Sequence, residues 1–159
     1  MWDLDGELDR GRGECLLIKR PLAEVVRRSI LLNNTETHLN IAWVIMPNHV
    51  HLLIKQWPGF KLGNIVKQIK GGSAHNLNKA LGRSGKVWQI GYFDRLIRSP
   101  LQLRQTVDYI HENPVKARLV SNSNNWSMSS CNGFEPAGLS RELGLPESWY
   151  EDCASISAR

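Results

Sequence analysis

The first half of the chain alternates between helical and strand-like hydrophobic patterns. Apolar residues at helical spacing within residues 21–34 predict an amphipathic helix. The run at residues 38–46 is rich in β-branched residues and predicts a strand, and residues 49–56 predict a second one. Pro47 and Asn48 mark a turn between them, so the two strands are expected to form a hairpin.

The middle of the chain combines apolar and basic positions. Residues 60–70 place apolar side chains on one helical face and lysines around the other, which predicts a basic amphipathic helix. This helix can continue through the Gly71-Gly72 pair as far as Leu81. Residues 81–86 then predict a loop, and residues 87–98 predict a third strand.

A last helix is expected over residues 100–113. Ser99 is a suitable N-cap and Gln102 completes a capping box, whereas Pro114 is expected to end or kink the helix. The order helix, strand, strand, helix, strand, helix predicts a layered α+β sandwich. We therefore expect one domain over residues 1–120, followed by a poorly defined tail over residues 121–159.

Length and composition exclude several classes of protein. A chain of 159 residues is long enough for one domain with a real core. Its apolar runs are too short to span a bilayer, and its N-terminus is acidic and unlike a signal peptide. The cysteines are three in number and far apart, which argues against a disulfide framework and for a cytoplasmic location.

Positive charge is concentrated in one part of the sequence. The net charge is +5, and the segment from Lys55 to Arg98 holds nine lysines or arginines against one acid. Such a concentration indicates a polyanionic partner, most often nucleic acid. An ordinary solvated surface explains the charge equally well at this stage.

Two histidines stand one residue apart inside an apolar run. Because side chains alternate along a strand, His49 and His51 are expected on one face and Val50, Leu52 and Ile54 on the other. Two imidazoles on one face can bind the same metal ion. Taken alone, the H-x-H pattern is more often a pair of hydrogen-bonded histidines.

The helix at residues 100–113 carries a second unusual pair. Tyr109 lies off the apolar stripe of Leu103, Val107 and Ile110, and Asn113 shares its face one turn later. This arrangement suits a nucleophile beside a metal ligand. The alternative is a tyrosine that anchors the helix through its hydroxyl group.

Three segments together resemble a known family. "AWVIMPNHVHLLI", "GRSGKVWQIGYFDRLIR" and "YIHENPVKARLV", in this order, are similar to the REP-associated tyrosine transposases of the HUH single-tyrosine transposase superfamily. The resemblance extends from about Gly13 to Ser130. It implies a ferredoxin-like two-layer sandwich with an antiparallel sheet, in an enzyme that cuts single-stranded DNA next to hairpins.

The resemblance also implies roles for individual residues. His49, His51 and Asn113 would bind Mg²⁺ or Mn²⁺, and Tyr109 would attack the DNA to form a 5′-phosphotyrosine link. The phosphate backbone would lie against basic residues of the second helix and the loop after it, which are Lys61, Lys67, Lys70, Arg83 and Lys86. Trp88, Tyr92 and Phe93 can stack on unpaired bases, although core packing is the more common role.

The sequence departs from the family in two places. The strand that opens the family fold, in the middle of the sheet, is expected to be absent, so an N-terminally truncated fold is predicted. Arg118 stands where the family commonly has glycine, which costs about 1 kcal/mol if that position requires a positive φ. A truncated or domesticated module that binds hairpin DNA without cutting it is therefore the alternative function. Monomer and dimer both remain open.

Overall fold

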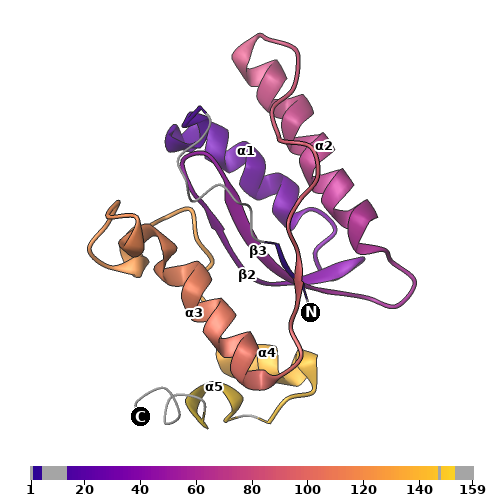
Figure 1. The fold of residues 1–159 in the computed structure, drawn as a ribbon, viewed down its shortest axis with the longest axis vertical. Helices are drawn as coiled ribbons and strands as arrows, with labels where there is room; N and C mark the ends of the chain where they lie inside the picture. Colours follow the sequence, from indigo (N-terminus) through magenta and orange to yellow (C-terminus); the bar gives the residue numbers. More distant parts are fainter. Residues whose placement is uncertain (1, 5–13, 147, 153–159) are drawn as a thin grey trace.

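The computed structural model describes residues 2–4, 14–146 and 148–152. In chain order the elements are β1 (Trp2–Leu4), η2 (Leu16–Ile18), α1 (Arg20–Leu31), β2 (His38–Ile45), β3 (Val50–Gln56), α2 (Leu62–Leu81), β4 (Arg95–Leu96), α3 (Pro100–Lys116), η3 (Ser123–Asn125), α4 (Pro136–Leu143) and α5 (Trp149–Asp152). The strands form one antiparallel sheet in the order β2-β3-β1-β4. Figure 1 shows the helices distributed over both faces of this sheet.

The strand alternation of β2 and β3 separates two hydrophobic cores. Leu52 and Ile54 pack with α1 and α2 on one face. Leu53 packs with the apolar stripe of α3 on the other face, where Leu103, Val107 and Ile110 are fully buried. The mixed helix and antiparallel-sheet architecture expected from the sequence is thus confirmed, and α3 adds a layer on the second face of the sheet.

The predicted hairpin and helices are present. β2 and β3 pair with Val44 opposite His51 and Ile45 opposite Val50. α2 runs without interruption through Gly71 and Gly72 and ends at Gly82, whose φ is +61°.

The last predicted helix begins and ends close to the expected residues. α3 begins where the capping box placed it, with the Ser99 hydroxyl accepting a hydrogen bond from the backbone N–H of Gln102 at 3.2 Å. The helix continues two residues beyond Pro114, so the proline lies in its last turn. Arg118 follows with φ +57°, which confirms the suspected left-handed position.

The middle of the sheet differs from the sequence-based expectation. Residues 2–4 form β1, which pairs with β3 on one side and with β4 on the other. The expectation of an absent strand at this position is therefore wrong, and the backbone groups of β3 have hydrogen-bonding partners on both sides.

The predicted third strand is mostly irregular. Of residues 87–98, only Arg95 and Leu96 form a strand. Gly91 has φ +76°, which interrupts an extended conformation, and Lys70 holds the preceding loop by donating to the carbonyls of Gln89 and Gly91 at 2.7 and 2.5 Å. A β-favouring composition was therefore overridden by a turn and by tertiary contacts.

The segment after α3 is an integral part of the fold. Residues 128–130 lie along the outer edge of β2. The backbone N–H of Ile45 donates to the carbonyl of Met128 at 2.8 Å, and the backbone N–H of Ser130 donates to the carbonyl of Trp43 at 2.9 Å. Trp149 is buried in the core beneath α3. None of the helices in the described part of the chain is long and apolar enough to cross a membrane.

Candidate active site

The two histidines are brought together by the hairpin between β2 and β3. Its turn is closed by the backbone N–H of Met46, which donates to the carbonyl of His49 at 2.9 Å. His49 directly precedes β3 and His51 is its second residue, so both rings lie on one face, as predicted. They are 4% and 0% exposed, and their Nε2 atoms are 3.0 Å apart.

Asn48 orients the first of these rings. Its amide oxygen, Oδ1, lies 2.7 Å from Nδ1 of His49. Because an amide oxygen only accepts hydrogen bonds, this contact places the proton of a neutral His49 on Nδ1. The lone pair of His49 Nε2 is then directed toward His51. Sequence analysis gave Asn48 only the role of a turn residue, although its place next to a candidate ligand was visible.

Tyr109, on α3, lies beside the histidine pair. It is half-buried on α3, and its ring meets that of His51 edge to face, with centroids 5.5 Å apart. It also packs against the core beneath α3, so it combines an apolar contact with a polar neighbour. Asn113 lies one helical turn later on the same helix and is 4% exposed.

The surroundings of Tyr109 also include Lys116, which the sequence analysis did not single out. The ammonium group of Lys116 lies 4.7 Å from the centroid of the Tyr109 ring. The two residues are seven positions apart, which is about two helical turns, so they share one face of the helix. This shared face is the sequence feature from which their contact could have been predicted. The ring of Tyr109 thus lies between an imidazole and an exposed cation.

The donor atoms are suited to a divalent metal ion. Two nitrogens that bind one ion side by side at about 2.1 Å are about 3.0 Å apart, and the two Nε2 atoms have this separation. The described residues contain no group of three or more His, Cys, Asp or Glu that could hold a metal ion. Any third protein ligand among these residues would be of another type, and an amide oxygen such as that of Asn113 belongs to the donors that suit such an ion.

His111 is a third buried histidine near this region, and it has a different environment. Its Nε2 is 2.9 Å from the Ser130 hydroxyl, and its ring packs edge to face against Phe134. Burial lowers the pKa of His111 to about 4, partly offset by the charges of Asp108 and Glu112. It is therefore a neutral link between α3 and the segment along β2.

The predicted DNA-binding residues differ in how available they are. Lys61, just before α2, Lys67 on α2 and Lys86 in the following loop are exposed, whereas Arg83 is paired with Glu14 at 3.0 Å. Lys70 is half-buried and holds the loop at residues 89–91, and this burial, together with the charge of Lys86, lowers its pKa.

The aromatic residues of the same region are divided between core and surface. Trp88 packs against the core and donates its indole N–H to the Ser73 hydroxyl at 2.9 Å. Tyr92 and Phe93 are 44% and 57% exposed, so the expectation that they pack in the core was wrong.

Comparison with known proteins places this fold and site in a family. Over 137 residues the chain is 28% identical to the REP-associated tyrosine transposase of Escherichia coli K12, covering 85% of this chain and 77% of that protein. A solved structure of a REP-associated tyrosine transposase bound to a REP hairpin superposes with a TM-score of 0.65 at 25% identity, covering 93% of this chain and 83% of that one. Residues 17–113 match the family model of IS200-like transposases, a range that includes both histidines, Tyr109 and Asn113. The chain belongs to the IS200-like transposase family.

Proposed function

We propose that this protein cuts and rejoins single-stranded DNA beside hairpins, using Tyr109 as the nucleophile and a divalent metal ion held by His49, His51 and Asn113. The observation that carries the proposal is the meeting of a buried histidine pair, Nε2 to Nε2 at 3.0 Å, with the ring of a helix-borne tyrosine. Membership of the IS200-like family and similarity to a protein bound to a REP hairpin support the reaction and the DNA partner.

The surroundings of the three tyrosines support Tyr109 as the nucleophile. The Tyr150 hydroxyl donates to Asp108 at 2.6 Å, and burial together with this carboxylate raises the pKa of Tyr150. Tyr92 is largely exposed on the loop that follows α2. Tyr109 is the tyrosine beside the histidine pair, so its hydroxyl group has the best access to a phosphate bound there.

The reaction proposed is a transesterification. The Tyr109 oxygen attacks phosphorus, its phenolic proton passes to solvent, and the bond from phosphorus to the 3′ oxygen breaks. The products are a 5′-phosphotyrosine and a 3′-hydroxyl that has taken up a proton. A bound Mg²⁺ or Mn²⁺ supplies polarisation of the phosphate oxygens. Lys116 contributes positive charge next to the Tyr109 ring, which becomes negatively charged as the phenol loses its proton.

The binding-only alternative has less support. It was suggested by the expected gap in the middle of the sheet, and β1 occupies that position. The candidate nucleophile and the candidate ligands are all present and lie on elements that face one another. A module that only bound DNA would have no need for a buried histidine pair next to a tyrosine.

Covalent trapping tests the proposal. A labelled hairpin oligonucleotide with a single-stranded flank, incubated with the protein and Mn²⁺, should give an adduct that survives denaturing electrophoresis. Tyr109→Phe should bind the DNA normally and give no adduct, whereas the matched control Tyr92→Phe should behave as wild type. EDTA should prevent the adduct. Cleavage by Tyr109→Phe would show that another group or water is the nucleophile.

A further inference from the structure

The register of the sheet shows which side chains share a face with the histidine pair. Leu53 follows His51 by two residues on β3, so both side chains lie on the same face. Arg95 of β4 pairs with Asp3 of β1, and Asp3 pairs in turn with Leu53. Directly paired residues of antiparallel strands point to one face of the sheet. Arg95 is therefore on the face that carries the histidines, on the second strand along from β3.

Two contacts agree with this placement of Arg95. Its guanidinium group donates to the Thr106 hydroxyl at 3.4 Å, and Thr106 belongs to α3, the helix that packs on the same face. Ile97, two residues after Arg95, is buried with the apolar stripe of α3. Strand alternation and tertiary contacts thus both direct the side chain of Arg95 toward α3 and away from α1 and α2.

Thr106 lies next to the candidate nucleophile. Thr106, Tyr109 and Asn113 follow one another at three- and four-residue spacing along α3, so they share one face of the helix. Cβ atoms at this spacing are about 5–6 Å apart. Thr106 is 2% exposed, so packing fixes its position, and its hydroxyl holds the Arg95 guanidinium about one helical turn from Tyr109.

The chemistry of Arg95 suits a phosphate of a DNA strand. Arg95 is exposed, and its guanidinium is a planar fork with more N–H donors than the Thr106 hydroxyl can accept. Such a fork binds phosphate through two parallel hydrogen bonds and is always charged. Along α3, Arg95 contacts the turn before Tyr109, and Lys116 lies two turns after it. A strand that follows α3 would therefore meet a cation on each side of Tyr109.

We infer that Arg95 binds a phosphate next to the one that Tyr109 attacks, and so positions the DNA strand for cleavage. This role rests on the proposed function for its ligand. It adds a residue of the edge strand β4 to a site otherwise formed by the β2–β3 hairpin and α3. Because Thr106 holds the guanidinium beside the helix, Arg95 would help to set the path of the strand across Tyr109.

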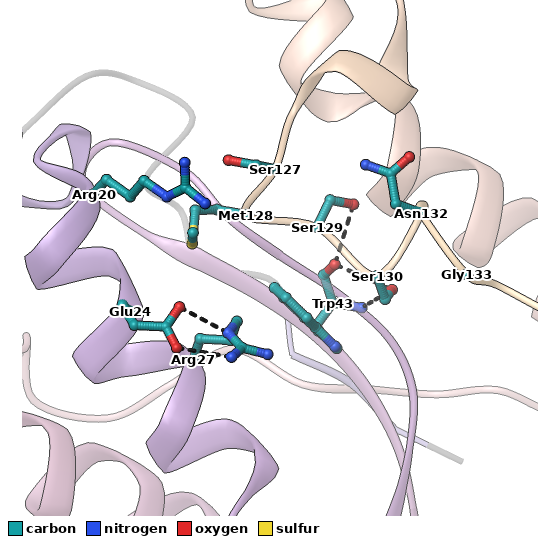
Figure 2. A pocket seen from close by; sticks show the side chains of 10 residues that line it. All are labelled: Arg20, Glu24, Arg27, Trp43, Ser127, Met128, Ser129, Ser130, Asn132 and Gly133. Carbon is teal, nitrogen blue, oxygen red and sulfur yellow. Dashed lines mark hydrogen bonds and ion pairs between the residues drawn. The ribbon is translucent and has the colours of Figure 1, made fainter.

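Arginines on the other face of the sheet provide a control. The helix α1 covers the face away from the histidines, and Figure 2 shows Arg20 and Arg27 of this helix beside a pocket. Arg27 is held by Glu24 through two hydrogen bonds of 2.8 and 2.7 Å. Arg20 is exposed, as Arg95 is. Arg20→Gln therefore removes the same charge from an exposed position on the opposite face.

Uncharged phosphate analogues test the contact without requiring cleavage. Tyr109→Phe protein, the parent here, is bound to a hairpin with a single-stranded flank in which one phosphate at a time is a methylphosphonate. At the contacted phosphate this change should weaken binding by the parent several-fold. Adding Arg95→Gln should weaken binding of unmodified DNA several-fold, lower the slope of log affinity against log salt by about 0.7, and abolish the effect of that methylphosphonate. Adding Arg20→Gln should leave the methylphosphonate effect intact.

The contacted phosphate should be one of the two that flank the cleavage site, as mapped with wild-type protein and Mn²⁺. If every methylphosphonate weakens binding equally with and without Arg95→Gln, or if the coupled phosphate lies farther from the cleavage site, the role of Arg95 is overturned. A wild-type protein that forms no adduct, with a single phosphate still coupled to Arg95, would overturn the catalytic proposal and leave the phosphate contact standing.

Chemical protection gives a second result that does not depend on the folding of an Arg95 variant. Tyr109→Phe protein is treated with phenylglyoxal, an arginine-specific reagent, with and without the flanked hairpin, and modified residues are identified by mass spectrometry. The DNA should slow modification of Arg95 several-fold and leave that of Arg20 unchanged. Equal modification of Arg95 in the two samples would refute its contact with the strand.

Discussion

Replacement of Asn48 by alanine should weaken metal binding without unfolding the protein. The 2.7 Å contact from the Asn48 amide oxygen to His49 Nδ1 keeps the lone pair of His49 on Nε2, toward His51. Without it, the ring is free to rotate or to move its proton to Nε2, which removes a ligand. Loss of such an outer hydrogen bond typically reduces metal affinity by about 10- to 100-fold, or about 1.4 to 2.7 kcal/mol.

Isothermal titration of Mn²⁺ into the apo-protein measures this effect directly. Asn48→Asp should retain the affinity, because a carboxylate accepts the same hydrogen bond. The matched control Asn64→Ala, an exposed asparagine on α2, should have no effect, and His51→Ala should abolish binding. Nitrogen chemical shifts of His49 should show loss of the Nδ1–H tautomer in Asn48→Ala. If that variant binds Mn²⁺ as tightly as wild type, Asn48 does not position the ligand.

Three further outcomes are expected. Lys116→Gln should slow adduct formation at saturating DNA by roughly two- to five-fold, since an exposed cation beside an aromatic ring contributes about 0.5 to 1 kcal/mol, whereas Lys79→Gln should not; equal rates would remove Lys116 from the mechanism. Arg118→Gly should raise the free energy of unfolding by up to about 1 kcal/mol in urea titrations, because glycine tolerates φ +57°, and Arg118→Ala should not. His111 has a pKa of about 6.5 in the unfolded chain and about 4 in the folded protein, so between these values only the unfolded chain is protonated there. The free energy of unfolding should therefore fall as the pH drops through this range, by at most about 3 kcal/mol. His111→Gln should flatten that dependence.

Local patterns predicted the parts of the fold that local physics determines. The alternation around His49 and His51 placed both rings on one face, because a strand leaves no other choice. The capping box at Ser99 gave the start of α3, and helical spacing carried α2 through two glycines that were expected to be tolerated. These patterns depend on interactions within a few residues, so the structures that they predict are present in the folded protein.

Features that depend on distant contacts were not predictable in this way. The strand expected over residues 87–98 was lost to Gly91 and to the lysine of α2 that holds its carbonyls. The segment at residues 127–130 has no periodic pattern, yet it lies along β2 because the edge of that strand offers unpaired backbone groups. The exposure of Tyr92 and Phe93 likewise follows from this irregular loop rather than from their hydrophobicity.

The arrangement of the site divides its tasks between two kinds of element. The histidine pair lies on a hairpin whose strand period fixes the spacing of the rings, whereas Tyr109 lies on a helix that must be held against the sheet. The C-terminal segment contributes to that hold, because Arg104 contacts both the backbone and the ring of Tyr150, and the Tyr150 hydroxyl bonds Asp108, the neighbour of Tyr109. The placement of Tyr109 thus depends on residues far along the chain, while that of the histidine pair depends on one local turn.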